Sequence, residues 1–167
     1  MNDRAPGAAG GPAPRAAVDR DPAWARLAGR AAGPLAIAGA LRAAGLDPVE
    51  VPAASDGETR SVLAAAAIGV TVADLAIADT GTVVQLGRPF RPRSVSLLPP
   101  AHLVVLPEDR ILGSLDDVLA AAAGDLGGPE GYMTLITGPS RTADIEKVLT
   151  IGVHGPGRIA VAIVEAI

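Results

Sequence analysis

The sequence contains no cysteine, which excludes disulfide bonds, thiolate nucleophiles and any iron–sulfur or zinc site built on its own cysteines. Its two histidines, His102 and His154, are too few for a three-histidine metal site. Aromatic residues make up 2% of the chain, too few to stack the bases of a single strand. The net charge of −4 also argues against a phosphate backbone as partner. We therefore expect no metal site, no cofactor bound by this chain and no nucleic-acid partner.

Long hydrophobic runs are also missing, although 49% of the residues are hydrophobic. Runs without charge or proline, such as Leu63 to Val72, stay well below the ~20 residues that a membrane-spanning helix needs. The first residues also lack the continuous apolar core of a secretory signal. We therefore expect a cytoplasmic protein without a membrane span. The length of 167 residues suits a single domain with a substantial core.

The chain divides into a short tail and one domain. Residues 1–20 are rich in Ala, Pro and Gly without periodicity and are expected to form a disordered tail, or else an arm that orders on a partner. Helices are predicted from Asp21 to Gly33 and over residues 35–44, 55–68, 114–124 and 142–151. Strands are predicted over residues 49–51, 75–78, 82–86, 102–106, 132–137 and 158–165. Because apolar strands alternate with helices, residues 21–167 are predicted to form an α/β domain with a mainly parallel sheet flanked by helices.

The strongest candidate for a binding site is the segment 137–142, which is expected to lead from a strand into the first turn of a helix. Backbone N–H groups at a helix N-terminus attract anions. Thr137, Ser140 and Thr142 would add hydroxyl donors beside the backbone of Gly138, and the guanidinium of Arg141 suits a carboxylate or phosphate. The alternative is structural, with Ser140 or Thr142 serving only as a helix cap.

Two further segments carry groups that could move protons. The turn Asp79-Thr80-Gly81 places a carboxylate beside hydroxyls, as in a general base, although a plain turn with Gly81 at positive φ explains it equally. His154 lies in a glycine-rich loop and is a candidate acid or base, a donor to a substrate oxygen, or a cap for the preceding helix. His102 opens a predicted strand, where a structural hydrogen bond is favoured.

Together these segments resemble the LUD domain family, and within it the lactate utilization proteins. The resemblance is carried by Asp74 and by residues 76–83, 96–99, 102–105, 137–146 and 152–156. It implies a fold like that of the ribose-5-phosphate isomerase and CoA-transferase superfamily, with a shorter N-terminal part than usual. It also implies a role in oxidising L-lactate to pyruvate beside two partner subunits, at least one carrying iron–sulfur clusters. The absence of cysteine agrees with the cluster-free member of such a complex.

The resemblance implies a non-redox subunit that binds a small anionic metabolite between the turn at Asp79, the segment 137–142 and His154. Arg141 would clamp the anion, Asp79 would act as base or orienting group, and His154 would handle a proton. The remaining residues expected at the ligand are Thr80, Gly81, Thr137, Gly138, Ser140 and Thr142. Two alternatives remain open: a stand-alone sugar-phosphate or acyl/CoA-type enzyme on the same fold, and a non-catalytic scaffold that binds protein only.

Overall fold

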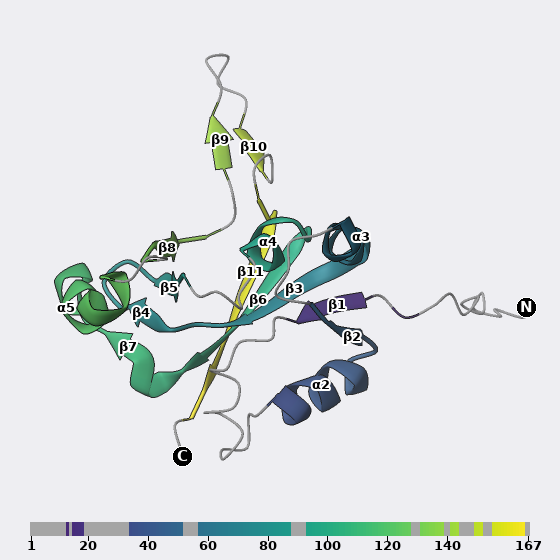
Figure 1. Cartoon of the computed structure of the whole chain (residues 1–167), viewed down its shortest axis with the longest axis horizontal. Helices are drawn as coiled ribbons and strands as arrows, with labels where there is room; N and C mark the ends of the chain where they lie inside the picture. Colours follow the sequence, from purple (N-terminus) through teal and green to yellow (C-terminus); the bar gives the residue numbers. More distant parts are fainter. Residues whose placement is uncertain are drawn as a thin grey trace, which may run out of the picture.

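The computed structural model describes residues 13, 15–18, 34–51, 57–87, 93–127, 131–138, 141–143, 149–151 and 155–165. Within these ranges a five-stranded sheet crosses the molecule, and a smaller four-stranded sheet lies toward one end of it (Figure 1). No helix in these ranges is both long and apolar enough to cross a membrane.

The five-stranded sheet is parallel throughout. Its strand order is β11 (Arg158–Val164), β6 (Ala101–Pro107), β3 (Ala66–Val72), β1 (Arg15–Val18) and β2 (Asp47–Glu50). Each neighbouring pair runs in the same direction. Central strands of such sheets are covered on both faces, so their sequences are apolar without alternation, as in the segment AHLVVLP of β6. The predicted α/β fold with a mainly parallel sheet is confirmed.

Helices cover this sheet from both sides. Figure 1 shows α2 (Pro34–Ala43) on one side, and α3 (Gly57–Ala65) and the short α4 (Ser94–Leu97) on the other. Leu41 of α2 packs into a core of buried residues that includes Val70, Val72 and Val105. A second core joins Leu63 of α3 to Val95 of α4. These two cores pack the helices onto the five-stranded sheet.

The four-stranded sheet is built on the predicted hairpin. Strands β4 (Leu75–Ile77) and β5 (Thr82–Leu86) are antiparallel, while β7 (Ile111–Leu112) and β8 (Met133–Ile136) add to its two edges. The single-turn 3-10 helix η1 (Glu108–Arg110) leads from β6 into β7. Helix α5 (Leu115–Leu126) buries Val118 and Ala122 against this sheet. It begins with a capping box, in which Ser114 and Asp117 each accept a hydrogen bond from the other's backbone N–H.

One strand lies inside the predicted tail, which is a correction to the sequence prediction. Arg15–Val18 form β1, hydrogen-bonded on one side to β2 and on the other to β3, and Ala16 is fully buried. The small side chain of Ala16 fits a strand that is covered by other elements. The Gly- and Pro-rich composition of residues 1–20 predicts disorder and hides so short a strand. Its hydrogen-bond partners lie far away in sequence, so no local pattern predicts it.

A second correction concerns the helix predicted to end at Ile68. The helix α3 ends at Ala65, and β3 begins at once and runs through Gly69. The segment is rich in β-branched residues, which favour extended backbone. Gly69 belongs to the strand because α4 packs against it, and a Cβ atom there would lie 1.9 Å from the carbonyl oxygen of Val95. The glycine therefore marks a close approach between backbones and not a helix end.

The helix predicted over residues 142–151 is also wrong where the structure describes it. Strands β9 (Arg141–Ala143) and β10 (Leu149–Ile151) pair antiparallel, with Thr142 opposite Thr150. Both threonines and Ile151 are β-branched, which favours this pairing over a helix. Residues 144–148, and the helix predicted from Asp21, lie outside the described residues. An anion at this segment would therefore meet the backbone of a strand, and not the helix N-terminus that the sequence predicted.

Candidate functional site

Three threonine hydroxyls meet where the two strongest sequence candidates come together. The Oγ1 atom of Thr82 lies 2.6 Å from Oγ1 of Thr80 and 2.9 Å from Oγ1 of Thr137. Thr82 and Thr137 are 55 residues apart in the sequence. The structure thus places the turn after β4 beside the segment after β8, and we call these three residues the threonine trio.

The antiparallel pairings bring the trio together. In the β4–β5 hairpin Ile77 pairs with Thr82, and Gly81 adopts a φ of +63° that completes the tight turn. On the other side of β5, Val83 pairs with Ile136, so the residues that precede and follow this pair, Thr82 and Thr137, are also neighbours. The predicted hairpin therefore brings Thr80 beside Thr82, and the pairing of β8 with β5 brings Thr137 beside Thr82.

The trio has unused hydrogen-bonding capacity. Three hydroxyls joined by two hydrogen bonds leave one hydroxyl hydrogen to donate elsewhere, and each oxygen retains acceptor capacity. Thr82 is buried, whereas Thr80 and Thr137 are exposed. The buried hydroxyl is therefore held by its two neighbours, and the exposed ones can reach a ligand oxygen.

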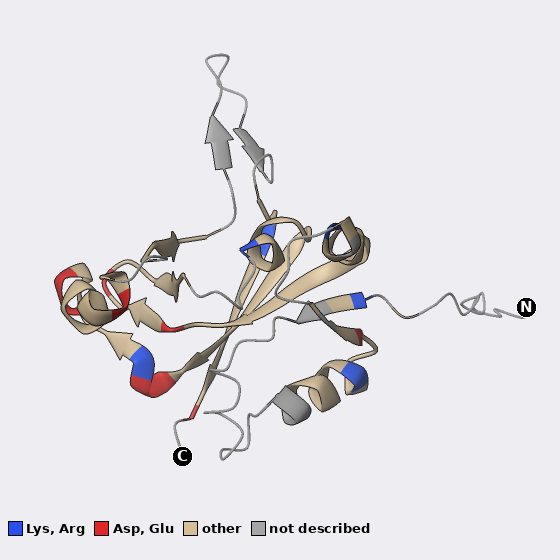
Figure 2. Ribbon diagram, viewed as in Figure 1, with Lys and Arg blue, Asp and Glu red and all other residues tan. Residues whose placement is uncertain are grey.

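A cavity of about 250 Å³ lies beside the β4–β5 hairpin, and Thr82 is among its lining residues. It lies between the hairpin and the carboxyl-terminal halves of β6 and β11. Its other lining residues are Ala76, Ile77, Ala78, Gly81, Val83, Leu106, Ile111, Val161 and Ile163. None of these carries a charge, so the cavity lining is apolar. Thr82 pairs with Ile77, which packs in the core against α5, so the hydroxyl of Thr82 projects to the opposite face of the small sheet from Val83 and Leu106. Figure 2 shows acidic residues on α5 and η1, which do not line this cavity.

The structure describes only some of the remaining predicted site residues. Asp79 is exposed, and its backbone N–H donates to the carbonyl of Gly113 at 3.2 Å, which anchors the turn. Gly138 is exposed with a φ of +145°, a conformation that favours glycine. Ser140 and His154 lie outside the described residues, as do the side chains of Arg141 and Thr142, whose backbone belongs to β9.

Sequence reasoning missed a buried polar network between the two sheets. The side-chain amide of Gln85 on β5 donates to Oγ1 of Thr71 on β3, which also lies 2.8 Å from Nε2 of His102 on β6. All three side chains are buried. The structural hydrogen bond predicted for His102 is confirmed. The available signal was a polar residue within a mostly apolar strand, Thr71 in β3 and Gln85 in β5.

Burial of this network keeps His102 neutral. Thr71 accepts from Gln85, and its Oγ1 also shares a hydrogen bond with Nε2 of His102, in which either atom can be the donor. Nδ1 is buried and has no hydrogen-bond partner among the described residues. Burial lowers the pKa of His102 from 6.5 to about 4, so the ring is neutral near pH 7.

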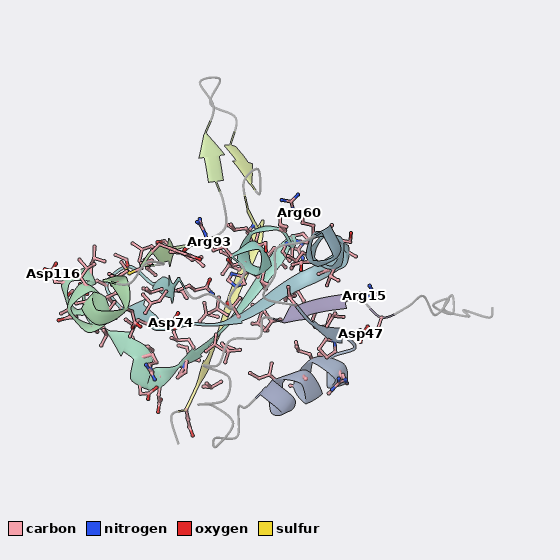
Figure 3. The ribbon with its side chains drawn as sticks, in the orientation of Figure 1. Arg15, Asp47, Arg60, Asp74, Arg93 and Asp116 are labelled. Atoms are coloured by element: carbon pink, nitrogen blue, oxygen red, sulfur yellow. The ribbon has the colours of Figure 1, made fainter. Side chains whose placement is uncertain are left out.

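Asp74 has a structural role at the junction of the two sheets (Figure 3). It follows β3 closely, is buried, and its Oδ2 accepts a hydrogen bond from the backbone N–H of Leu86 at 2.8 Å. Its own N–H donates to the carbonyl of Val84. The carboxylate therefore holds the end of β5 against the start of β4, which explains its place in the motif.

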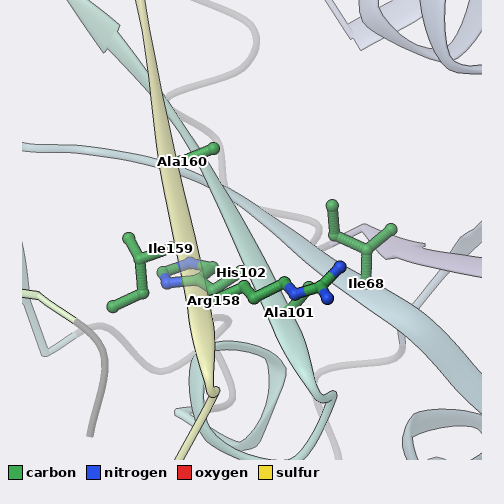
Figure 4. Close-up of a pocket in the computed structure, with 6 residues that line it drawn as sticks. All are labelled: Ile68, Ala101, His102, Arg158, Ile159 and Ala160. Carbon is green, nitrogen blue, oxygen red and sulfur yellow. The ribbon is translucent and has the colours of Figure 1, made fainter.

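A second cavity, of about 530 Å³, opens at the amino-terminal ends of β3, β6 and β11 (Figure 4). His102 and Arg158 both line it, but the register separates their side chains. Arg158 pairs with Ala101, and Ile159 pairs with His102, so adjacent rows project to opposite sides of the sheet. Figure 4 shows Arg158 reaching toward Ile68 on one side and His102 beside Ile159 on the other. These two side chains do not form a joint anion site.

One known protein family matches most of the chain. The family described as the LUD domain matches residues 28–164. The chain belongs to the LUD domain family. The matched residues include the threonine trio, the cavity beside the hairpin and the buried network. Among the residues that the structure describes, no group of three His, Asp or Glu side chains is placed to hold a metal ion.

Curated relatives match part of the chain. It is 37% identical over 111 residues to lactate utilization protein C of Exiguobacterium sp., covering 64% of this chain and 48% of that protein. It is 34% identical over 101 residues to lactate utilization protein C of Bacillus subtilis, covering 59% and 42%. The chain thus matches about half the length of these relatives.

A solved structure shares the fold. It is a crystal structure of a DUF162 family protein from Deinococcus radiodurans, with a TM-score of 0.55 and 23% sequence identity. The similarity covers 92% of this chain and 88% of that one. The α/β architecture described above is therefore also found in an experimental structure.

Proposed function

We propose that this chain is the cluster-free subunit of an iron–sulfur system that oxidises L-lactate to pyruvate. In this proposal it binds a small anionic metabolite at the threonine trio, and its partner subunits carry the clusters. The observation that carries the proposal is its 37% identity to a lactate utilization protein C across a segment of 111 residues. The absence of cysteine supports the assignment to a subunit without clusters of its own.

The geometry supports a binding role for the trio. The free hydroxyl hydrogen can donate to a carboxylate or hydroxyl oxygen of the ligand, and the exposed Asp79 on the same turn can accept or orient a proton. Arg141, which follows Thr137 in the same segment, is the candidate counter-charge. Oxidation of lactate removes an electron pair from its hydroxyl-bearing carbon, and in this proposal a partner subunit accepts it.

The test is reconstitution with the cluster-bearing partners. Lactate-dependent reduction of a dye is measured with the partners alone and after adding this chain. The proposal expects the rate to depend on the added chain. Equal rates with and without it would overturn the assignment.

A variant separates ligand binding from assembly. Arg141→Ala is expected to weaken the thermal stabilisation that lactate or pyruvate gives, because the charge-assisted hydrogen bonds to the carboxylate are lost. Arg60→Ala, on the exposed surface of α3, is the matched control and should leave this stabilisation unchanged. If Arg141→Ala also leaves every ligand response unchanged while the complex still assembles, the protein-binding scaffold is the better description.

A further inference from the structure

Strand β11 forms one outer edge of the five-stranded sheet, beside β6 (Figure 1). Among the described residues β6 is its only strand partner, so the backbone N–H and C=O groups on its other side are open to a further strand. Proteins commonly block such an edge with charged residues or proline. The opposite edge, β2, has both, since its sequence is DPVE. After its first residue, Arg158, β11 has neither.

One face of β11 is an exposed apolar row. Side chains at alternate positions of a strand share a face, so Ile159, Val161 and Ile163 lie on one side of the sheet. Val161 is 44% exposed and Ile163 is 62% exposed. Both also line the cavity of about 250 Å³ beside the hairpin. An apolar row that continues into an apolar cavity is typical of an interaction surface.

The sequence of β11 is complementary to itself. Residues 159–163 read Ile-Ala-Val-Ala-Ile, which is the same in both directions. Two copies related by a two-fold axis through Val161 would pair antiparallel, with each of these residues opposite one of its own kind. The axis keeps the apolar rows of both copies on the same face of the joined sheet. Ile159 of one copy would then cover the exposed Ile163 of the other.

The charges at the ends of β11 favour the same antiparallel arrangement. The strand begins with Arg158 and is followed by Glu165, and both residues are exposed. Pairing centred on Val161 places Arg158 opposite Val164 of the second copy, one position from its Glu165. Opposite charges therefore come together at both ends of the pair. A parallel pairing of two copies would instead bring the two arginines together at one end and the two glutamates together at the other.

We propose that β11 is the surface through which a second copy of this chain binds, so that the two five-stranded sheets form one continuous sheet across a symmetric dimer. Backbone hydrogen bonds between the two β11 strands supply part of the affinity. Burial of Val161 and Ile163 supplies the rest, because both side chains leave water when the strands pair. The dimer is independent of the proposed function, since it involves neither the threonine trio nor a metabolite.

The first experiment measures the mass of the full chain in solution by sedimentation equilibrium at a series of concentrations. The proposal expects a reversible dimer with twice the chain mass of 16.6 kDa, more populated as the concentration rises. A monomer at every concentration would overturn the proposal and would leave this edge to a partner of another kind.

Charged substitutions at Val161 test the position of the two-fold axis. Val161→Lys and Val161→Glu each place two like charges opposite each other, so each variant alone should dimerise at least about tenfold more weakly than the wild type. Mixing the two variants pairs opposite charges, and the mixed dimer should form at least about tenfold more tightly than either variant with itself. The absence of any gain on mixing would overturn the pairing through Val161.

Leu119→Lys is the matched control. Leu119 is 41% exposed, close to the 44% of Val161, and it belongs to α5, which packs on the four-stranded sheet. The same new charge at this position should leave dimerisation unchanged. Thermal unfolding of all three variants checks that they fold. If Leu119→Lys weakens dimerisation as much as Val161→Lys does, the interface is not at β11 and the proposal fails.

Discussion

Replacing His102 with glutamine should remove an acid-sensitive contribution to the stability of this protein. The His102 side chain is 1% exposed, and its Nε2 lies 2.8 Å from the hydroxyl of Thr71. Burial lowers the pKa of His102 from 6.5 to about 4. The folded chain therefore keeps the ring neutral at pH values where the unfolded chain protonates it.

The sign and size of the effect follow from these two pKa values. The stabilisation is fully present above the unfolded pKa of 6.5 and is lost as pH falls through the folded pKa of about 4. The difference between the two values corresponds to about 3 kcal/mol in the free energy of unfolding. Well below pH 4 the ring is protonated in both states, and this contribution no longer changes.

The assay is urea unfolding of the wild type and His102→Gln across this pH range. Glutamine does not titrate and can still hydrogen-bond to Thr71, while all other titrating groups are common to both proteins. The wild type should lose roughly 2–3 kcal/mol more than the variant between about pH 7.5 and pH 4.5. Parallel pH profiles, or a His102 pKa near 6.5 measured by NMR, would refute this reasoning.

Three further substitutions test the packing. Gly69→Ala should destabilise the fold by more than about 3 kcal/mol, because its Cβ would lie 1.9 Å from the Val95 carbonyl oxygen, and a near-neutral urea midpoint would contradict that approach. Ser114→Ala should cost about 1 kcal/mol by removing the cap of α5, measured as the shift in the same transition. Leu63→Ala should cost about 2–5 kcal/mol by leaving a cavity in the core, whereas Leu119→Ala, at 41% exposure, should cost far less.

Local sequence signals predicted much of the fold, including the turn that carries Thr80 and Thr82. The hairpin around Gly81 and the start of α5 at Ser114 depend on turn and capping chemistry between residues a few positions apart. The mainly parallel sheet followed from apolar strands alternating with helices. The expectation that the Asp79 turn lies near the segment after β8 came from family resemblance, and the Thr82–Thr137 contact agrees with it.

The sequence by itself determined the absence of cysteine chemistry, the α/β class and the positions of most strands, because composition and periodicity are local properties. Only the tertiary structure decided that Arg15–Val18 form a strand inside the sheet and that Gly69 belongs to β3. It also decided that Gln85, Thr71 and His102 meet. Each of these depends on partners distant in sequence, whose hydrogen bonds and close contacts exist only once the strands have paired.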